Sequence, residues 1–304
     1  MRETPATDGL LLGFVPVHVV HLAHAVRTVA WAASSVGLTA GRVAIRARRG
    51  GSRPPVTRRE SRMVFVVGSP RSGTTFVGNA LGAQPGFADL GEVPLLKAAV
   101  PRLVRRPVQQ QAREIRMLIQ LVRNLAVVHG LRGVEQNPET SYVLEGALRA
   151  YPAATAVHVI RDGRDVVCSL LERGWLGAGR AGSDDAKQAF GAHARFWVEP
   201  DRRAEFEAAS EATRAAWAWR SYVTAARAAP DRTIELCYES LVADPQGEAR
   251  RVAQELDAEP GPLADAFSEV HADSIGRWRR DLTPEQLADV EAEAGVLLAE
   301  LGYS

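Results

Sequence analysis

Cysteine, lysine and long apolar runs are all scarce in this chain of 304 residues. The two cysteines, Cys168 and Cys237, allow at most one bridge, which excludes a disulfide-stapled fold and favours a reducing, cytoplasmic setting. Lys97 and Lys187 are the only lysines among 37 basic residues, so arginine supplies nearly all of the positive charge. Arginine suits bidentate phosphate recognition. The formal net charge of +1 argues against a general nucleic-acid-binding protein.

The uncharged run at residues 10–26 is interrupted by glycine, proline and histidines, and it is shorter than the roughly 20 apolar residues that span a membrane. Over residues 18–35 the apolar and polar side chains fall on opposite sides, which predicts an amphipathic helix. Eight arginines follow within residues 42–62. Two placements stay open: residues 10–60 contact the inner membrane face through anionic lipid, or the helix packs on protein, including a second copy in a homodimer.

Glycines and prolines at residues 50–55 mark a linker, which divides the chain into residues 1–60, an amphipathic helix with a basic linker, and a globular domain at residues 61–304. Short apolar runs predict buried strands at residues 63–67, 155–160 and 233–238. Helical patterns lie between and after them, at residues 75–82, 115–126, 164–171 and 205–228 and from a capping signature at residues 283–286 onward. This alternation predicts an α/β fold, a P-loop-like parallel sheet flanked by helices, with an N-terminal helical appendage.

The first predicted strand leads into a turn typical of anion binding. Residues 68–76 read GSPRSGTTF, in which two glycines let the backbone wrap closely before a helix N-terminus with unbonded N–H groups. The glycine spacing matches a Walker A loop, but Thr74 stands where that motif requires lysine, which disfavours a nucleoside triphosphatase. The candidate side-chain donors of this cradle are Arg71, Ser72, Thr74 and Thr75.

A second segment adds Arg161 and Ser169. Arg161 falls at the carboxyl end of a predicted strand and Ser169 two turns into the next helix, and ligands of open α/β sheets bind at that edge. The pair can hold a second phosphate. Alternatively, Arg161 joins Asp162, Arg164 and Asp165 in a structural ion network.

The two segments together resemble the sulfotransferases that use 3′-phosphoadenosine 5′-phosphosulfate (PAPS), in their bacterial form, from about residue 63 to the C-terminus. The resemblance implies that the loop through Gly73 holds the 5′-phosphosulfate and that Arg161 and Ser169 hold the 3′-phosphate. Phe76 stands where the family usually has an aromatic that stacks on adenine. Two further segments, LCYESLVADP at 236–245 and SIGRWRRDLTP at 274–284, look like family elements and imply nucleotide contacts by Tyr238, Arg277 and Arg279.

Sulfuryl transfer to a hydroxyl needs a base within hydrogen-bond reach. Glu92, 21 residues after Arg71, resembles in its placement the catalytic glutamate of tyrosylprotein and several bacterial sulfotransferases. The alternative is a glutamate favoured by a helix N-terminus. His193 and His129 are the next candidates. Relatives often read K-T-P where this chain has Gln136 and the two residues after it, so the family's lysine is absent. Either Arg71 alone neutralises the developing charge, or the acceptor is held differently.

The resemblance therefore implies an enzyme that moves a sulfuryl group from PAPS to a hydroxyl of a small-molecule, lipid or carbohydrate acceptor. Arg71 and Glu92 are the expected catalytic residues, and no metal is expected. Two alternatives remain: a P-loop-type small-molecule kinase, which the missing lysine disfavours, and a non-catalytic nucleotide-binding or membrane-scaffolding protein.

Overall fold

The computed structural model of the chain describes residues 37, 40–41, 63–128, 131–176 and 198–303. The helix predicted at residues 18–35 and the linker at residues 50–55 lie outside the described residues, so the membrane and homodimer alternatives stay predictions. Among the helices that are described, none is both long and apolar enough to span a bilayer.

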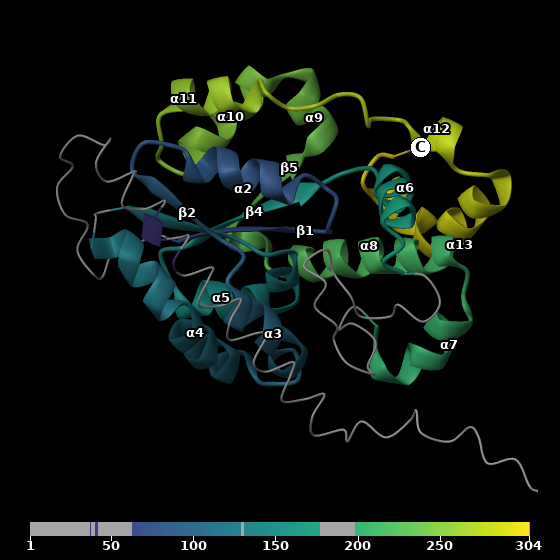
Figure 1. Cartoon of the computed structure of the whole chain (residues 1–304), viewed down its shortest axis with the longest axis horizontal. Helices are drawn as coiled ribbons and strands as arrows, with labels where there is room; N and C mark the ends of the chain where they lie inside the picture. The colour runs from purple at the N-terminus through teal and green to yellow at the C-terminus, as the bar shows by residue number, and fades with distance from the viewer. Residues whose placement is uncertain (1–36, 38–39, 42–62, 129–130, 177–197, 304) are drawn as a thin grey trace, which may run out of the picture.

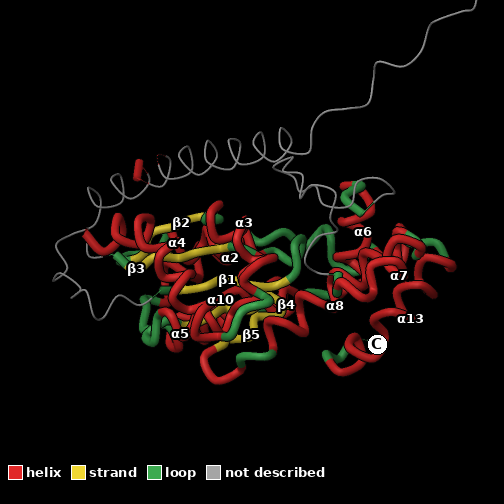
Figure 2. Tube along the Cα trace, turned by 90° about the horizontal axis from the view of Figure 1, so that it is seen from below, coloured by secondary structure: helices red, strands yellow, loops and turns green. Residues whose placement is uncertain are grey.

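A five-stranded parallel sheet lies at the centre of the described residues, in the order β2-β3-β1-β4-β5. Figure 2 shows these strands in yellow, one below another. In sheet order they are β2 (Phe87–Gly91), β3 (Arg132–Gln136), β1 (Val64–Gly68), β4 (Thr155–Ile160) and β5 (Thr233–Cys237). Because all neighbours are parallel, every strand ends at the same edge, which is where ligands of such sheets bind.

Helices cover both faces of the sheet (Figure 1). One face carries α2 (Thr74–Gly82), α9 (Tyr238–Ala243), α10 (Pro245–Glu255) and α11 (Pro260–Phe267). The other carries α3 (Pro94–Leu103), α4 (Val108–Val128) and α5 (Leu144–Ala150). Alternate residues of β1 face opposite layers: Phe65 packs with the α3–α5 cluster, whereas Val64 and Val66 pack with the α2 and α10 cluster.

A third cluster lies beyond the end of the sheet and packs around the tryptophans of α8. It joins α6 (Gly163–Arg173), α7 (Arg203–Ala208), α8 (Glu211–Arg227) and α13 (Pro284–Glu300). The short α12 (Trp278–Asp281) lies next to α6. Helix α6 carries Ser169, and Trp219 of α8 donates a hydrogen bond to the Arg161 carbonyl. These helices therefore contact the edge of the sheet at which the strands end.

The predicted α/β class is confirmed, and so are three predicted strands: β4 has the expected bounds, and β1 and β5 differ from them by one residue. The last helix starts as expected. Thr283 Oγ1 accepts a hydrogen bond from Gln286 N at 3.2 Å, and Gln286 Oε1 accepts one from Thr283 N at 3.0 Å. This reciprocal pair is a capping box.

The single helix predicted over residues 205–228 is wrong, because the chain forms α7 and α8 there. The break lies at Ser210, whose side chain accepts a hydrogen bond from Thr213 N at 3.0 Å and caps α8. Serine is among the strongest N-cap residues, and it outweighs the alanine-rich pattern around it. Strands β2 and β3 were not among the predicted elements.

Candidate active site

The loop between β1 and α2 contains glycines with positive φ angles. Gly68 and Gly73 have φ angles of 139° and 97°, and a Cβ on Gly73 would lie 2.7 Å from the Tyr238 ring. Both positions therefore need glycine. Ser72 is buried, and its Oγ has no hydrogen-bond partner among the described residues. Helix α2 begins at Thr74, and its first-turn N–H groups point back at this loop.

Arg161 and Ser169 meet the loop as expected. Arg71 Nε donates to Ser169 Oγ at 2.9 Å, and Arg161 Nη1 donates to the Arg71 carbonyl at 3.3 Å. Arg161 Nη2 donates to the Ser274 carbonyl at 2.6 Å, while its buried Nε has no hydrogen-bond partner in the described part of the chain. A buried guanidinium that is bonded to carbonyls keeps its positive charge available for an anion. The residues present thus fit a ligand with phosphate groups.

Tyr238 opens α9 beside these groups. Its ring centroid lies 4.8 Å from the guanidinium carbon of Arg161, and its hydroxyl donates to the His271 carbonyl at 2.9 Å. Burial raises the pKa of this phenol, so the hydroxyl stays a donor at neutral pH. Phe76, half-buried on α2, packs against Phe267 of α11 with ring centroids 6.3 Å apart. The Tyr238 ring therefore packs against Arg161, whereas the Phe76 ring packs against helix α11.

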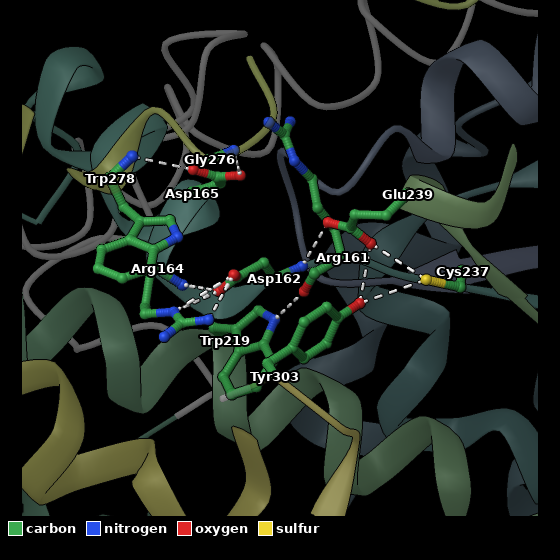
Figure 3. Close-up of polar contacts among 10 residues, drawn as sticks. All are labelled: Arg161, Asp162, Arg164, Asp165, Trp219, Cys237, Glu239, Gly276, Trp278 and Tyr303. Atoms are coloured by element: carbon green, nitrogen blue, oxygen red, sulfur yellow. Dashed lines mark hydrogen bonds and ion pairs between the residues drawn. The ribbon is translucent and has the colours of Figure 1, made fainter. Parts of the chain in front are cut away.

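Residues 271–278, which we call the strap, are tied to the site at several points. Asp165 Oδ2 accepts the Gly276 N–H at 2.7 Å, and Asp165 Oδ1 accepts the Trp278 N–H at 3.1 Å (Figure 3). Burial raises the pKa of the Asp165 carboxyl, and the two N–H bonds oppose that rise. Together with the bonds that Arg161 and Tyr238 donate to strap carbonyls, these contacts hold the strap over the sheet edge.

Arg277 and Arg279 have different surroundings from the loop residues. Arg277 pairs with Glu172 and lies 2.7 Å from Asp281, and the bond to Glu172 raises its pKa. Arg279 is exposed, with its guanidinium carbon 4.4 Å from the Trp278 ring centroid. Their contact with a nucleotide stays a prediction, as does that of Thr75, which is exposed on α2.

The structure also contains part of the ion network that the sequence offered as an alternative role for Arg161. Arg164 Nη2 lies 2.8 Å from Asp162 Oδ2, and both side chains are largely buried. The Asp162 N–H donates to Glu239 Oε1 at 2.9 Å, and Trp219 Nε1 donates to the Arg161 carbonyl at 3.1 Å (Figure 3). These bonds fix the backbone that carries Arg161. The ion pair of Arg164 with Asp162 is therefore structural, and the ligand role of Arg161 stays a prediction.

Glu92 directly follows β2, at the same sheet edge as the loop. Its Oε2 lies 2.8 Å from Lys97 Nζ, and Lys97 Nζ also lies 3.7 Å from Glu139 Oε2. Glu92 precedes Val93, the N-cap of α3, and the first turn of that helix holds no acid. Glu92 thus lies at the N-terminal end of α3, and both its role as the base and the helix-terminus alternative stay predictions. His129 and His193 lie outside the described residues, and no cluster able to ligate a metal occurs within the described ones.

Residues 120–260 match the family model described as the sulfotransferase family. This match covers less than half of the chain and supports a relationship to that family. A Caenorhabditis briggsae protein named as a candidate protein-tyrosine sulfotransferase is 25% identical over 206 residues, which cover 64% of this chain and 65% of that protein. The chain therefore matches less than two thirds of that relative's length.

Solved sulfotransferases share the fold. Sulfotransferase STF9 from Mycobacterium avium is 15% identical with a TM-score of 0.50, over 90% of this chain and 84% of that one. The sulfotransferase domain of the curacin biosynthetic pathway is 17% identical with a TM-score of 0.49, over 83% of this chain and 99% of that domain. The family match and the relative support a transferase enzyme, and the solved structure of STF9 shows the shared fold.

Sequence reasoning missed two parts of the candidate site. The contacts of Asp165 with the strap span more than a hundred residues, and no local pattern indicates them. The second missed part is Lys97. Lysine is so rare in this chain that each lysine could have been singled out from the sequence as a candidate for a specific role. The burial of Lys97 between Glu92 and Glu139 places it at the sheet edge.

Proposed function

We propose that this sulfotransferase transfers a sulfuryl group from PAPS to a hydroxyl of its acceptor. The observation that carries the proposal is the pair of buried donors without hydrogen-bond partners among the described residues, Ser72 Oγ in the loop and Nε of Arg161 beside it. Buried polar groups are normally hydrogen-bonded, so such a pair supports a bound anionic ligand. The donor would supply an activated sulfuryl group whose leaving group is adenosine 3′,5′-bisphosphate.

The residues of the site suit the chemistry of that transfer. Arg71 and the N–H groups at the start of α2 would stabilise negative charge on the sulfuryl group and on the bridging oxygen, as preorganised donors do in phosphoryl transfer. As the acceptor oxygen bonds to sulfur and the bridging S–O bond breaks, Glu92 takes the hydroxyl proton. Arg161 and Ser169 would hold the 3′-phosphate, with Tyr238 and Phe76 near the base.

The acceptor is proposed as a hydroxyl of a small molecule, lipid or carbohydrate, in a bacterial cytoplasm or at its inner membrane face. The name of the Caenorhabditis briggsae relative favours a second candidate, the phenolic hydroxyl of a protein tyrosine. A panel of phenols, sterols, sugars and tyrosine peptides with sulfur-labelled PAPS distinguishes the two. Label transfer supports the proposal, whereas Mg²⁺-dependent phosphate transfer from ATP would favour the kinase alternative.

Nucleotide binding tests the site without an acceptor. Arg161→Ala and Ser169→Ala should each weaken binding of adenosine 3′,5′-bisphosphate by about ten-fold or more, because a hydrogen bond to a charged group contributes about 1.5 to 3 kcal/mol. Binding of adenosine 5′-monophosphate should change little. Arg149→Ala, at an exposed position on α5, is the matched control. Equal losses for both nucleotides would mean that the pair only supports the fold.

A further inference from the structure

Lys97 is buried among carboxylates at the sheet edge. Its Nζ lies 2.8 Å from Glu92 Oε2 and 3.7 Å from Glu139 Oε2. The lysine side chain is 5% exposed and that of Glu139 1%, whereas Glu92 is 31% exposed. Lys97 thus contacts Glu92 from the buried side and leaves part of that carboxyl group accessible from solvent.

The three groups come from separate elements. Glu92 follows β2, Lys97 lies in the first turn of α3, and Glu139 belongs to the 3-10 helix η1 (Pro138–Val143) that follows β3. Strands β2 and β3 are neighbours, so both glutamates lie at the end of adjacent strands. The cation of the cluster comes from α3.

A third carboxyl group, that of Glu135, adjusts the charge of the cluster. Burial raises the pKa of Glu135 well above its ordinary value, and the neighbouring Glu92 and Glu139 add to the rise. The raised pKa lessens the negative charge that Glu135 adds to the cluster, and Glu135 accepts a hydrogen bond from Thr140 Oγ1 at 3.3 Å.

Neighbouring elements add further contacts. Tyr222 of α8 donates its hydroxyl to Glu139 Oε1 at 3.4 Å. On α4, which packs against α3, Glu114 pairs with Arg102, and Arg116 donates to the Ala150 carbonyl. Proton uptake by Glu92 would leave Lys97 and Glu139 as an ion pair, since Lys97 Nζ lies 3.7 Å from Glu139 Oε2.

We propose that Lys97 is a positioning residue for Glu92: its ammonium holds the carboxylate charged and oriented for proton transfer, and it turns to Glu139 once Glu92 is protonated. This inference rests on the proposed function of Glu92 as the base. A lysine suits the role because its compact ammonium rotates between partners, whereas the planar guanidinium of arginine favours one bidentate geometry. This accounts for a lysine at this position in a chain in which only two of the 37 basic residues are lysine.

The titration of Glu92 tests the inference without any turnover. Lys97→Met alone leaves Glu139 buried without its cation and can prevent folding, because uncompensated buried charges are strongly destabilising. The comparison is therefore between Glu139→Gln and the double variant Lys97→Met with Glu139→Gln, which differ only in the cation. The carboxyl carbons are followed by NMR in protein labelled with 13C-glutamate, and the Glu92 signal is the one that Glu92→Gln removes.

Without Lys97 the midpoint of the Glu92 titration should rise by about 1 to 3 pH units, the usual effect of an opposite charge at this range. Equal midpoints in the two variants would overturn the inference. In the pH profile of single-turnover sulfation, the acidic limb should move to higher pH by the same amount. If the NMR midpoint of Glu92 moves but this limb does not, the positioning role is overturned as well. Absence of sulfation by the unaltered enzyme would instead refute the proposed function, while the NMR midpoints still decide whether Lys97 holds Glu92.

Discussion

At the scale of single residues, Gly73 joins the anion loop to the aromatic side chain beside it. Its φ of 97° is a left-handed conformation, and an added Cβ would lie 2.7 Å from the Tyr238 ring. Gly73→Ala should therefore lower the free energy of unfolding by about 1 to 3 kcal/mol and weaken binding of adenosine 3′,5′-bisphosphate. Gly261→Ala, on α11 with open space around its Cβ, is the matched control and should change stability by less than about 1 kcal/mol. Urea melts and nucleotide titrations on both variants measure this, and wild-type binding by Gly73→Ala would contradict the loop's proposed role.

Glu92 is the residue on which the chemistry depends. Glu92→Gln keeps the size and most hydrogen bonding but removes the proton acceptor, so single-turnover sulfation should fall by about 10² to 10⁴. Affinity for the bisphosphate should stay nearly unchanged. Glu145→Gln, at an exposed site on α5, controls for loss of a surface charge. Near-normal sulfation by Glu92→Gln would remove Glu92 from the mechanism and direct the search to His193 and His129.

At the scale of elements, a strand that is buried on both faces of the sheet can be predicted from the sequence when its residues are mostly apolar. Strands β1, β4 and β5 could be predicted because they are short apolar runs between turn residues. Strands β2 and β3 read FADLG and RGVEQ, with glycine, acids and an amide in five residues each. Glu135 and Gln136 are buried at the end of β3 although both are polar. Buried polar residues thus mask the strand pattern.

His158 in the middle of β4 gives this element a pH dependence. The side chain is fully buried, and its Nδ1 lies 3.9 Å from Glu235 Oε1. Burial lowers the pKa of His158 below its ordinary value near 6.5, and the carboxylate of Glu235 opposes this only in part. The unfolded chain therefore binds a proton that the folded chain does not. Stability is full above pH 6.5 and falls as pH decreases from there toward the folded pKa.

The expected slope in that window is at most about 1.4 kcal/mol per pH unit. His158→Leu should lack it, so the difference in unfolding free energy between the unaltered protein and the variant should shrink or change sign as pH decreases from 7 to 5. Urea unfolding at several pH values measures this difference directly. A difference that stays constant over the range would show that His158 does not titrate between the two states.

At the scale of the whole molecule, the candidate site is built from segments far apart in sequence. Arg71 meets Ser169 across 98 positions, and Arg161 meets Ser274 across 113. Spacing alone cannot predict such contacts, and only the family resemblance brought these residues together before the structure did. The resemblance did not indicate Lys97, because the contacts of Lys97 with Glu92 and Glu139 arise from the fold. The contacts of Lys97 therefore became apparent only in the structure.

The division of the chain at residue 60 is the prediction that concerns the whole protein. The described residues from Met63 onward contain the sheet, the loop and three packed apolar clusters. A chain of residues 61–304 should therefore fold cooperatively and bind adenosine 3′,5′-bisphosphate as tightly as the full chain. If residues 10–60 lie on a membrane, the truncated protein should also lose its sedimentation with anionic vesicles, and the loss should be largest at low salt, where basic residues attract lipid most. Equal sedimentation of both forms would exclude the membrane alternative. Loss of cooperative unfolding in the truncated form would instead place the N-terminal helix in the packing of the domain.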